Sequence, residues 1–123
     1  MTTKDVANRL VELCRTGRWD LAQAELYHPE CESIEPKGAP MEYIKGMEAI
    51  KQKGEHWGSM VEEMHGAEVS DPIVAGDFFT ISMVMDVTYK GAPRKKDPEL
   101  CVYEVKDGKV IKEQFFYPSP PAQ

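Results

Sequence analysis

The sequence has few cysteines and no long apolar segment. Its three cysteines, Cys14, Cys31 and Cys101, lack CxxC spacing and are odd in number. This pattern is typical of buried, reduced thiols rather than of a disulfide framework or a zinc site. No apolar run approaches the ~20 residues that a membrane-spanning helix requires. We therefore expect no metal, no other cofactor and no membrane partner.

Positive charge is scarce as well. The chain has 15 Lys and Arg residues against 21 Asp and Glu residues, which gives a formal net charge of -6. An acidic chain is repelled by phosphate backbones, so nucleic acid is not an expected partner. The basic cluster Arg94-Lys95-Lys96 stands between Gly91 and Pro98, which is typical of a solvated hairpin tip.

The length favours a single domain. A chain of 123 residues is large enough to bury a core without support from a disulfide or a metal. We expect one domain at residues 1–117 and a Pro-rich tail at 118–123. The first residues lack the apolar core of a secretion signal, so the expected compartment is the cytoplasm.

Helical periodicity marks the first part of the chain. Apolar residues at spacings of three and four predict a helix over residues 4–16. A second helix is predicted over 19–26, because Pro29 cannot continue a helical hydrogen-bond ladder. The two form a helical hairpin, in which Trp19 and Tyr27 are interpreted as packing residues.

A third and longest helix is predicted over residues 46–64. Gly54 lies on its apolar stripe, where it either permits the close approach of another backbone or is merely tolerated. The stripe consists of Met47, Ile50, Trp57, Met60, Val61 and Met64.

Strand-like alternation marks most of the remaining chain. A short strand is expected over 31–35 and ends at Pro36. In the run 78–90, the face that carries Met83 and Met85 should cover the core. Helices segregated from hairpin strands indicate an α+β fold. We expect a cone-shaped, curved antiparallel (mixed) sheet wrapped around the long helix, and the open end of such a cone is a natural ligand site. The further strands are expected at 67–75, 99–106 and 110–117.

Four segments resemble the nuclear transport factor 2-like superfamily, which includes ketosteroid isomerases and SnoaL-like polyketide cyclases. They are Gly17-Arg18-Trp19-Asp20, the stretch from Leu26-Tyr27 to Glu35-Pro36, Gly46 with Ile50, and Asp107-Gly108-Lys109-Val110. The resemblance implies the cone fold. It leaves function open, because the superfamily contains enzymes as well as binding and dimerisation modules.

Glu35 is the residue to which the resemblance gives a role. Ketosteroid isomerases carry an Asp-Pro at the end of the first strand, and this aspartate is their general base. Glu35-Pro36 stands at the matching place. In those enzymes a tyrosine and a protonated aspartic acid stabilise the enolate. The corresponding places in this sequence fall on Leu10 and near Cys101, neither of which can polarise an enolate well.

Residues on the predicted inward faces complete a candidate site. Glu113 is a second carboxylate which, if close to Glu35, should push one of the two pKa values toward neutrality. Tyr103 or Tyr117 could donate a hydrogen bond to a substrate oxygen. The candidate catalytic residues are therefore Glu35, Tyr103 and Glu113, and the candidate pocket residues are Ser33, Trp57, Met83, Met85, Cys101, Phe115 and Tyr117.

Glu35 and Glu113 each have an alternative interpretation in which the residue has only a structural role. Glu35 can instead be a strand-end carboxylate that is bonded to backbone donors, to Lys37 or to Lys45. Glu113 can face outward if the run 111–114 contains a one-residue bulge.

Two functions are compatible with the sequence. The first is a cofactor-independent isomerase, cyclase or dehydratase that acts on a small apolar carbonyl compound with Glu35 as general base. The second is a non-catalytic ligand-binding or dimerisation module, whose interior would be narrow or filled. For either function a homodimer is expected, as in many members of the superfamily that the chain resembles, because Val84, Thr88, Val102 and Phe116 stand among polar neighbours on the outer sheet face.

Overall fold

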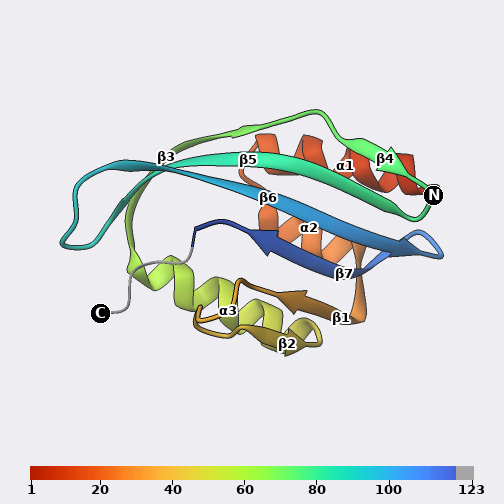
Figure 1. Cartoon of the computed structure of the whole chain (residues 1–123), viewed down its shortest axis with the longest axis horizontal. Helices are drawn as coiled ribbons and strands as arrows, with labels where there is room; N and C mark the ends of the chain where they lie inside the picture. The colour runs from red at the N-terminus through yellow and green to blue at the C-terminus, as the bar shows by residue number, and fades with distance from the viewer. Residues whose placement is uncertain (119–123) are drawn as a thin grey trace.

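The computed structural model describes residues 1–118, which form three helices and a seven-stranded curved sheet (Figure 1). The predicted tail at 118–123 lies, apart from its first residue, outside the described residues. No helix in the described part is long and apolar enough to cross a membrane. The elements are α1 (Thr3–Arg15), α2 (Trp19–Leu26), β1 (Tyr27–Ile34), β2 (Tyr43–Lys45), α3 (Met47–Met60), β3 (Val61–Val69), β4 (Ile73–Ala75), β5 (Phe78–Tyr89), β6 (Lys95–Lys106) and β7 (Lys109–Phe116).

The sheet is mixed, as the sequence predicted. Its strands follow the order β2-β1-β7-β6-β5-β3, and β4 pairs with β5 outside this path. All pairs are antiparallel except β1 with β7, which runs parallel. The parallel pair brings the first strand of the chain beside the last one, so side chains about 80 residues apart in sequence become neighbours.

Several element boundaries differ from the prediction. The strand expected at 67–75 is divided into β3, which starts at Val61, and β4, and the strand expected at 99–106 starts at Lys95. The third helix ends at Met60 rather than at Met64, because residues from Val61 onward pair with β5. The apolar spacing within residues 61–64 is too short a pattern to show whether they end a helix or start a strand. The strand expected at 31–35 begins at Tyr27, with a register shift before Glu32 that accommodates Pro29. The short strand β2 was not predicted.

Most of the helical core comes from α1, not from the longer α3. Thr2 and Asp5 form a capping box at the start of α1, and the inward side of α1 is buried against β3 and β5. In α3 only Ile50 is fully buried. No atom lies within 4 Å of a Cβ built on Gly54, so this glycine is tolerated rather than needed for close packing. The buried α1 residues are Val6, Ala7, Leu10, Val11, Leu13 and Cys14.

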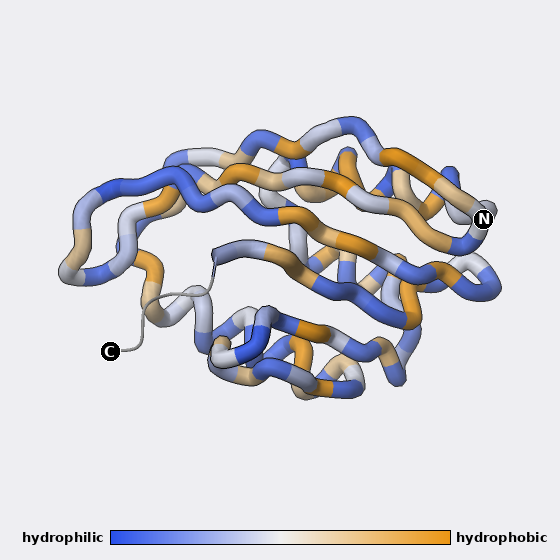
Figure 2. Tube along the Cα trace, in the orientation of Figure 1, coloured by the Kyte–Doolittle hydropathy of each residue, from blue (hydrophilic) through white to orange (hydrophobic). Residues whose placement is uncertain are grey.

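The inward face of β5 is the predicted one. Ile81, Met83 and Val87 are buried on it, and their cross-strand neighbours on β6 include buried Cys101. Figure 2 shows hydrophilic residues along the β5–β6 connection. There Lys95 is exposed, as predicted, but it already belongs to β6, and Arg94 binds Asp86 through two hydrogen bonds of 2.8 and 2.9 Å.

Candidate functional site

A one-residue bulge in β7 directs Glu113 into the interior. On β6 the buried residues Tyr103 and Val105 are two positions apart, but their partners Glu113 and Val110 on β7 are three apart. Ile111 is therefore the extra residue, and strict alternation from Val110 would have turned Glu113 outward. From the sequence we expected that a bulge in this run would turn Glu113 outward, whereas the bulge turns it inward. Glu113 is 3% exposed.

The buried Glu113 carboxylate is held by two hydroxyl groups. The Tyr27 hydroxyl donates to Oε1, and the Ser33 hydroxyl donates to Oε2 at 2.6 Å. Both donors belong to β1, and Ser33 is the direct partner of Glu113 in the parallel pair. Burial, followed by the adjacent Glu113 charge, raises the pKa of Tyr27 well above its usual value, so this hydroxyl is a permanent donor at neutral pH.

Lys53 connects this buried group to Glu35. Helix α3, which carries Lys53, is preceded by its N-cap Gly46, whose φ of 95° is rarely adopted by other residues. The Gly46 amide donates to the Cys31 carbonyl at 2.8 Å and so ties the start of α3 to β1. From α3 the Lys53 ammonium donates to the Ser33 hydroxyl at 2.5 Å and to Glu35 Oε1 at 3.5 Å.

Glu35 follows the end of β1 and is only 16% exposed in its side chain. Its Oε1 faces Lys53, whereas Oε2 is buried and has no hydrogen-bond partner among the described residues. Burial raises the pKa of Glu35, while Lys53 and the Tyr117 hydroxyl act in the opposite direction. The arrangement is a carboxyl group with one oxygen anchored and the other buried without a hydrogen-bond partner among the described residues.

Glu99 is a third carboxyl group at the same place. It lies on β6 near Cys101, whose thiol donates a hydrogen bond of 3.6 Å to it. Burial, and after it the nearby Glu35 charge, raises the pKa of Glu99 to about 7. Burial also raises the pKa of Tyr117 to about 12. The group whose pKa lies near neutrality is thus Glu99, which is not among the candidate residues selected from the sequence.

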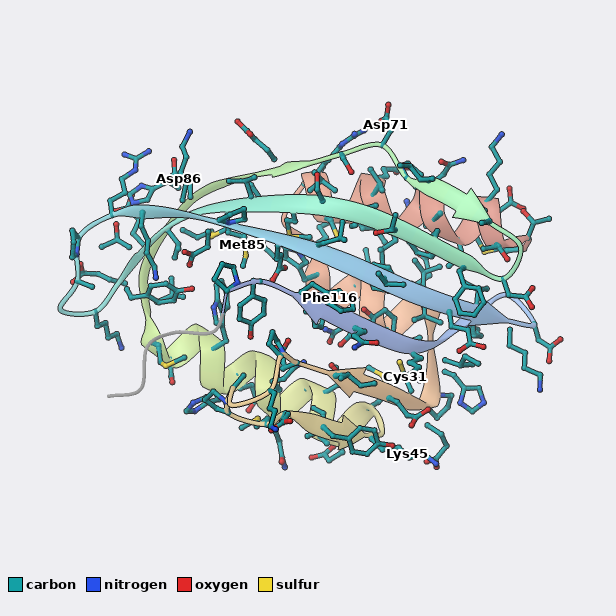
Figure 3. The ribbon with its side chains drawn as sticks, in the orientation of Figure 1. Cys31, Lys45, Asp71, Met85, Asp86 and Phe116 are labelled. Atoms are coloured by element: carbon teal, nitrogen blue, oxygen red, sulfur yellow. The ribbon has the colours of Figure 1, made fainter. Side chains whose placement is uncertain are left out.

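The predicted residues divide into two groups. Ser33, Cys101, Met83 and Tyr103 are buried in the core, and the Tyr103 ring stacks on Phe79 at a centroid distance of 4.7 Å. Tyr103 is therefore enclosed in the core. The half-buried group consists of Trp57, Met85, Phe115 and Tyr117. The Phe115 ring lies beside Lys53, and Figure 3 labels Met85 on β5 and Phe116, the neighbour of Phe115, on β7.

Two residues that organise the site were missed at the sequence level. Tyr27 was interpreted as a packing residue, and Lys53 was not considered. A signal for Lys53 is present, because it stands three residues after Ile50 and four before Trp57, on the apolar stripe of α3. A lysine on such a stripe must bring its charge to a polar partner.

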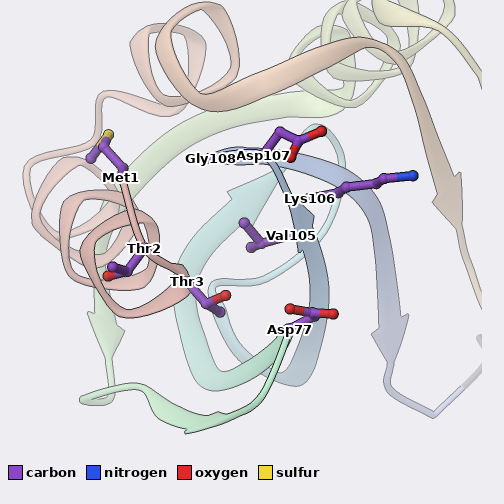
Figure 4. A pocket seen from close by; sticks show the side chains of 8 residues that line it. All are labelled: Met1, Thr2, Thr3, Asp77, Val105, Lys106, Asp107 and Gly108. Atoms are coloured by element: carbon purple, nitrogen blue, oxygen red, sulfur yellow. The ribbon is translucent and has the colours of Figure 1, made fainter.

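Two surface hollows are lined by residues other than Glu35, Glu99 and Glu113. One, of about 570 Å³, is found between the start of α1 and the β6–β7 turn and includes Asp77 and Lys106 (Figure 4). The other, of about 240 Å³, includes Glu68 and Lys96. Neither contains any of the predicted site residues. Within residues 1–118, no group of three or more His, Cys, Asp or Glu side chains is arranged to hold a metal ion.

The chain belongs to the SnoaL-like domain family, which matches residues 1–117. A protein from Mesorhizobium loti, provisionally assigned as a SnoaL-like polyketide cyclase, has a similar crystal structure. The two chains are 34% identical, 95% of this chain and 100% of that chain are covered, and the TM-score is 0.90. No curated protein matches the chain.

More distant structures share the fold. TerC co-crystallised with polyporic acid is 16% identical over 94% of this chain and 91% of its own, with a TM-score of 0.77. A Catenulispora acidiphila protein with a ketosteroid isomerase-like fold, in complex with trimethylamine, is 19% identical over 91% of this chain and 84% of its own, with a TM-score of 0.73.

Proposed function

We propose that this protein is a cofactor-independent enzyme that moves a proton on a small, apolar carbonyl compound, as an isomerase, cyclase or dehydratase does, with Glu35 as general base. The observation that carries the proposal is the unpartnered Oε2 of Glu35, which is buried beside an ammonium group. A buried acceptor without a partner is costly in a folded protein. A ligand that offers a proton to this atom removes the cost.

The neighbouring groups suit acid–base chemistry. The raised pKa of Glu35 makes it a stronger base than an exposed glutamate. Glu99, with a pKa of about 7, can hold a proton at neutral pH and deliver it to a leaving hydroxyl or to a second carbon. Tyr117 replaces Tyr103 as the proposed tyrosine donor, because it approaches Glu35 and is half-buried rather than enclosed.

The comparisons support a small organic substrate. The family contains polyketide cyclases, and a relative that is 34% identical has a provisional assignment of this kind. Two neighbours of the same fold were crystallised with polyporic acid and with trimethylamine, which are both small organic molecules.

Proton exchange tests the proposal without knowledge of the full reaction. A panel of small ketones and enones is incubated with the protein in D₂O, and loss of the α-proton signal is followed by NMR. The wild type should exchange at least one compound, and Glu35→Gln should lower that rate by about 10²- to 10⁴-fold. Glu30→Gln, which changes an exposed carboxylate on β1, the strand that precedes Glu35, should not alter it. Exchange that is equally fast in Glu35→Gln would contradict the proposal.

The non-catalytic alternative has one supporting observation. Met83 is 4% exposed and Cys101 is completely buried, so part of the predicted pocket wall is packed as core. If the alternative holds, panel compounds shift resonances of residues near Glu35 in the wild type, while no compound loses its α-proton.

A further inference from the structure

Lys53 has one N–H donor that no hydrogen bond to the described residues uses. An ammonium group carries three N–H donors. Among the described residues Lys53 makes two hydrogen bonds, to Ser33 at 2.5 Å and to Glu35 at 3.5 Å. Glu113 Oε2 lies 3.9 Å away, beyond hydrogen-bond distance. The Lys53 side chain is 17% exposed, so it is not completely enclosed by the protein.

This donor stands next to the free acceptor of Glu35. Lys53 contacts Oε1 of that carboxylate, and Oε2 is the atom without a partner. A donor and an acceptor on adjacent groups match the two reacting parts of a ketone, its carbonyl oxygen and the hydrogen on the neighbouring carbon. The Phe115 ring, with its centroid 4.9 Å from the Lys53 nitrogen, limits the positions that the ammonium can occupy.

We propose that Lys53 stabilises the enolate oxygen in the reaction for which Glu35 is the base. This inference rests on the proposed function and supplies the group that Leu10 and Cys101 do not provide. Glu35 removes the α-proton, the electron pair of the C–H bond forms a carbon–carbon double bond, and the carbonyl π pair moves to oxygen. Lys53 donates a hydrogen bond to that oxygen and keeps its proton. Glu35 then returns its proton to carbon, which balances the step.

The charges around Lys53 define the substrate class. Glu35, Glu99 and Glu113 share this region with Lys53. A substrate that carries its own carboxylate or phosphate is repelled by these groups. An uncharged ketone or enone is admitted and becomes anionic only as Glu35 accepts the proton, so Lys53 binds the transition state better than the ground state. The substrate is therefore an uncharged carbonyl compound with an α-hydrogen.

Binding of 4-nitrophenolate tests the role of Lys53 without turnover. A phenolate resembles an enolate, and Glu35→Gln mimics the base after it has taken the proton. Glu35→Gln should bind 4-nitrophenolate at least tenfold more tightly than the wild type does. Adding Lys53→Met should weaken binding about tenfold or more, whereas adding Lys51→Met, an exposed lysine on the same helix, should not. Absorbance of the bound phenolate gives the dissociation constants.

A second measurement covers the case in which Lys53→Met does not fold. In Glu35→Gln with ¹⁵N-labelled lysine, the Lys53 ammonium resonance should shift when 4-nitrophenolate is added, and the Lys51 resonance should not. The proposal is overturned if no variant binds the phenolate, if the double variant binds it as well as Glu35→Gln does, or if the Lys53 resonance does not move.

The two proposals fail in different ways. If Glu35→Gln abolishes α-proton exchange but the affinity for phenolate does not depend on Lys53, Glu35 remains the base and the role proposed for Lys53 is wrong. If phenolate binding requires Lys53 but exchange does not depend on Glu35, Lys53 remains the anion-binding group and the base assignment is wrong.

Discussion

The Ser33 hydroxyl donates a hydrogen bond of 2.6 Å to the buried carboxylate of Glu113. The two residues are direct partners in the parallel pair of β1 and β7, so the first and last strands are joined by side chains as well as by backbone. The same hydroxyl accepts from Lys53. The buried carboxylate thus fixes the position of the lysine through a single oxygen atom.

Removal of the Tyr27 hydroxyl should destabilise the fold. In Tyr27→Phe, the buried Glu113 carboxylate loses one of its two hydroxyl donors, which should cost about 1.5–3 kcal/mol in the free energy of unfolding. Urea denaturation measures the change. Tyr43→Phe is a matched control, because its hydroxyl contacts Glu32 at an exposed place, and it should change stability by less than about 0.5 kcal/mol. Equal effects of the two variants would contradict the prediction.

Glu99 should make the protein less stable as the pH rises, because the pKa of this carboxyl group is raised in the folded state. The pKa of this carboxyl is raised from 4.5 to about 7 in the folded protein, so between these pH values the native state binds more protons than the unfolded state. Its contribution to stability is present below pH 4.5 and is lost as the pH rises through 7. Glu35, whose pKa is also raised, acts in the same direction.

Urea denaturation between pH 4.5 and 8 tests this assignment. The free energy of unfolding of the wild type should decline with rising pH relative to that of Glu99→Gln. Glu104→Gln, on the opposite face of β6, should follow the wild type. Parallel pH profiles for the wild type and Glu99→Gln would show that Glu99 does not titrate in this range.

The three thiols should be unreactive in the native protein. Burial raises the pKa of Cys14 and of Cys31 to about 12, and burial likewise raises the pKa of Cys101. Because the thiolate is the reactive form, Ellman's reagent at pH 8 should modify no native cysteine within minutes and all three after denaturation in urea. An introduced cysteine at exposed Ser59 should react at once and serves as the control. Rapid reaction of a native thiol would contradict the prediction.

We propose that the outer sheet face binds a second copy of the chain. Leu100 and Phe116 are direct cross-strand partners there and are 45% and 47% exposed, and Val102 lies next to them on β6. Leu100→Glu should therefore shift a dimer toward monomer in sedimentation at micromolar concentration. Leu21→Glu, on α2, should leave the mass unchanged. A wild type that is monomeric under these conditions would refute the proposed dimer.

The sequence predicted the fold well because local patterns specify it. Period-two alternation in β5 assigned Ile81, Met83 and Val87 to the core, and they are buried. Asp107 and Gly108 have φ values of 51° and 76°, the turn conformation that an Asp-Gly pair favours between two strands. The boundary between α3 and β3 was misplaced because Val61 and Met64 continue the helical spacing, while register shifts in the pairing of β3 with β5 remove strict alternation from this part of the strand.

The site was less predictable because it depends on contacts between distant segments. Glu35 was found through its place before Pro36. Lys53 and Tyr27 acquire their roles only when α3 and β7 lie against β1, and no spacing within a single segment reports that. Likewise, the pKa of Glu99 near neutrality follows from burial and from Glu35, which are properties of the assembled sheet.

The bulge at Ile111 decides which charge the last strand presents to the interior. If β7 kept all its residues but paired with β6 without the bulge, strict alternation from Val110 would place Lys112 opposite Tyr103 and turn Glu113 outward. A shift of one residue in pairing register would therefore replace the buried acid by a basic side chain, with no residue substituted.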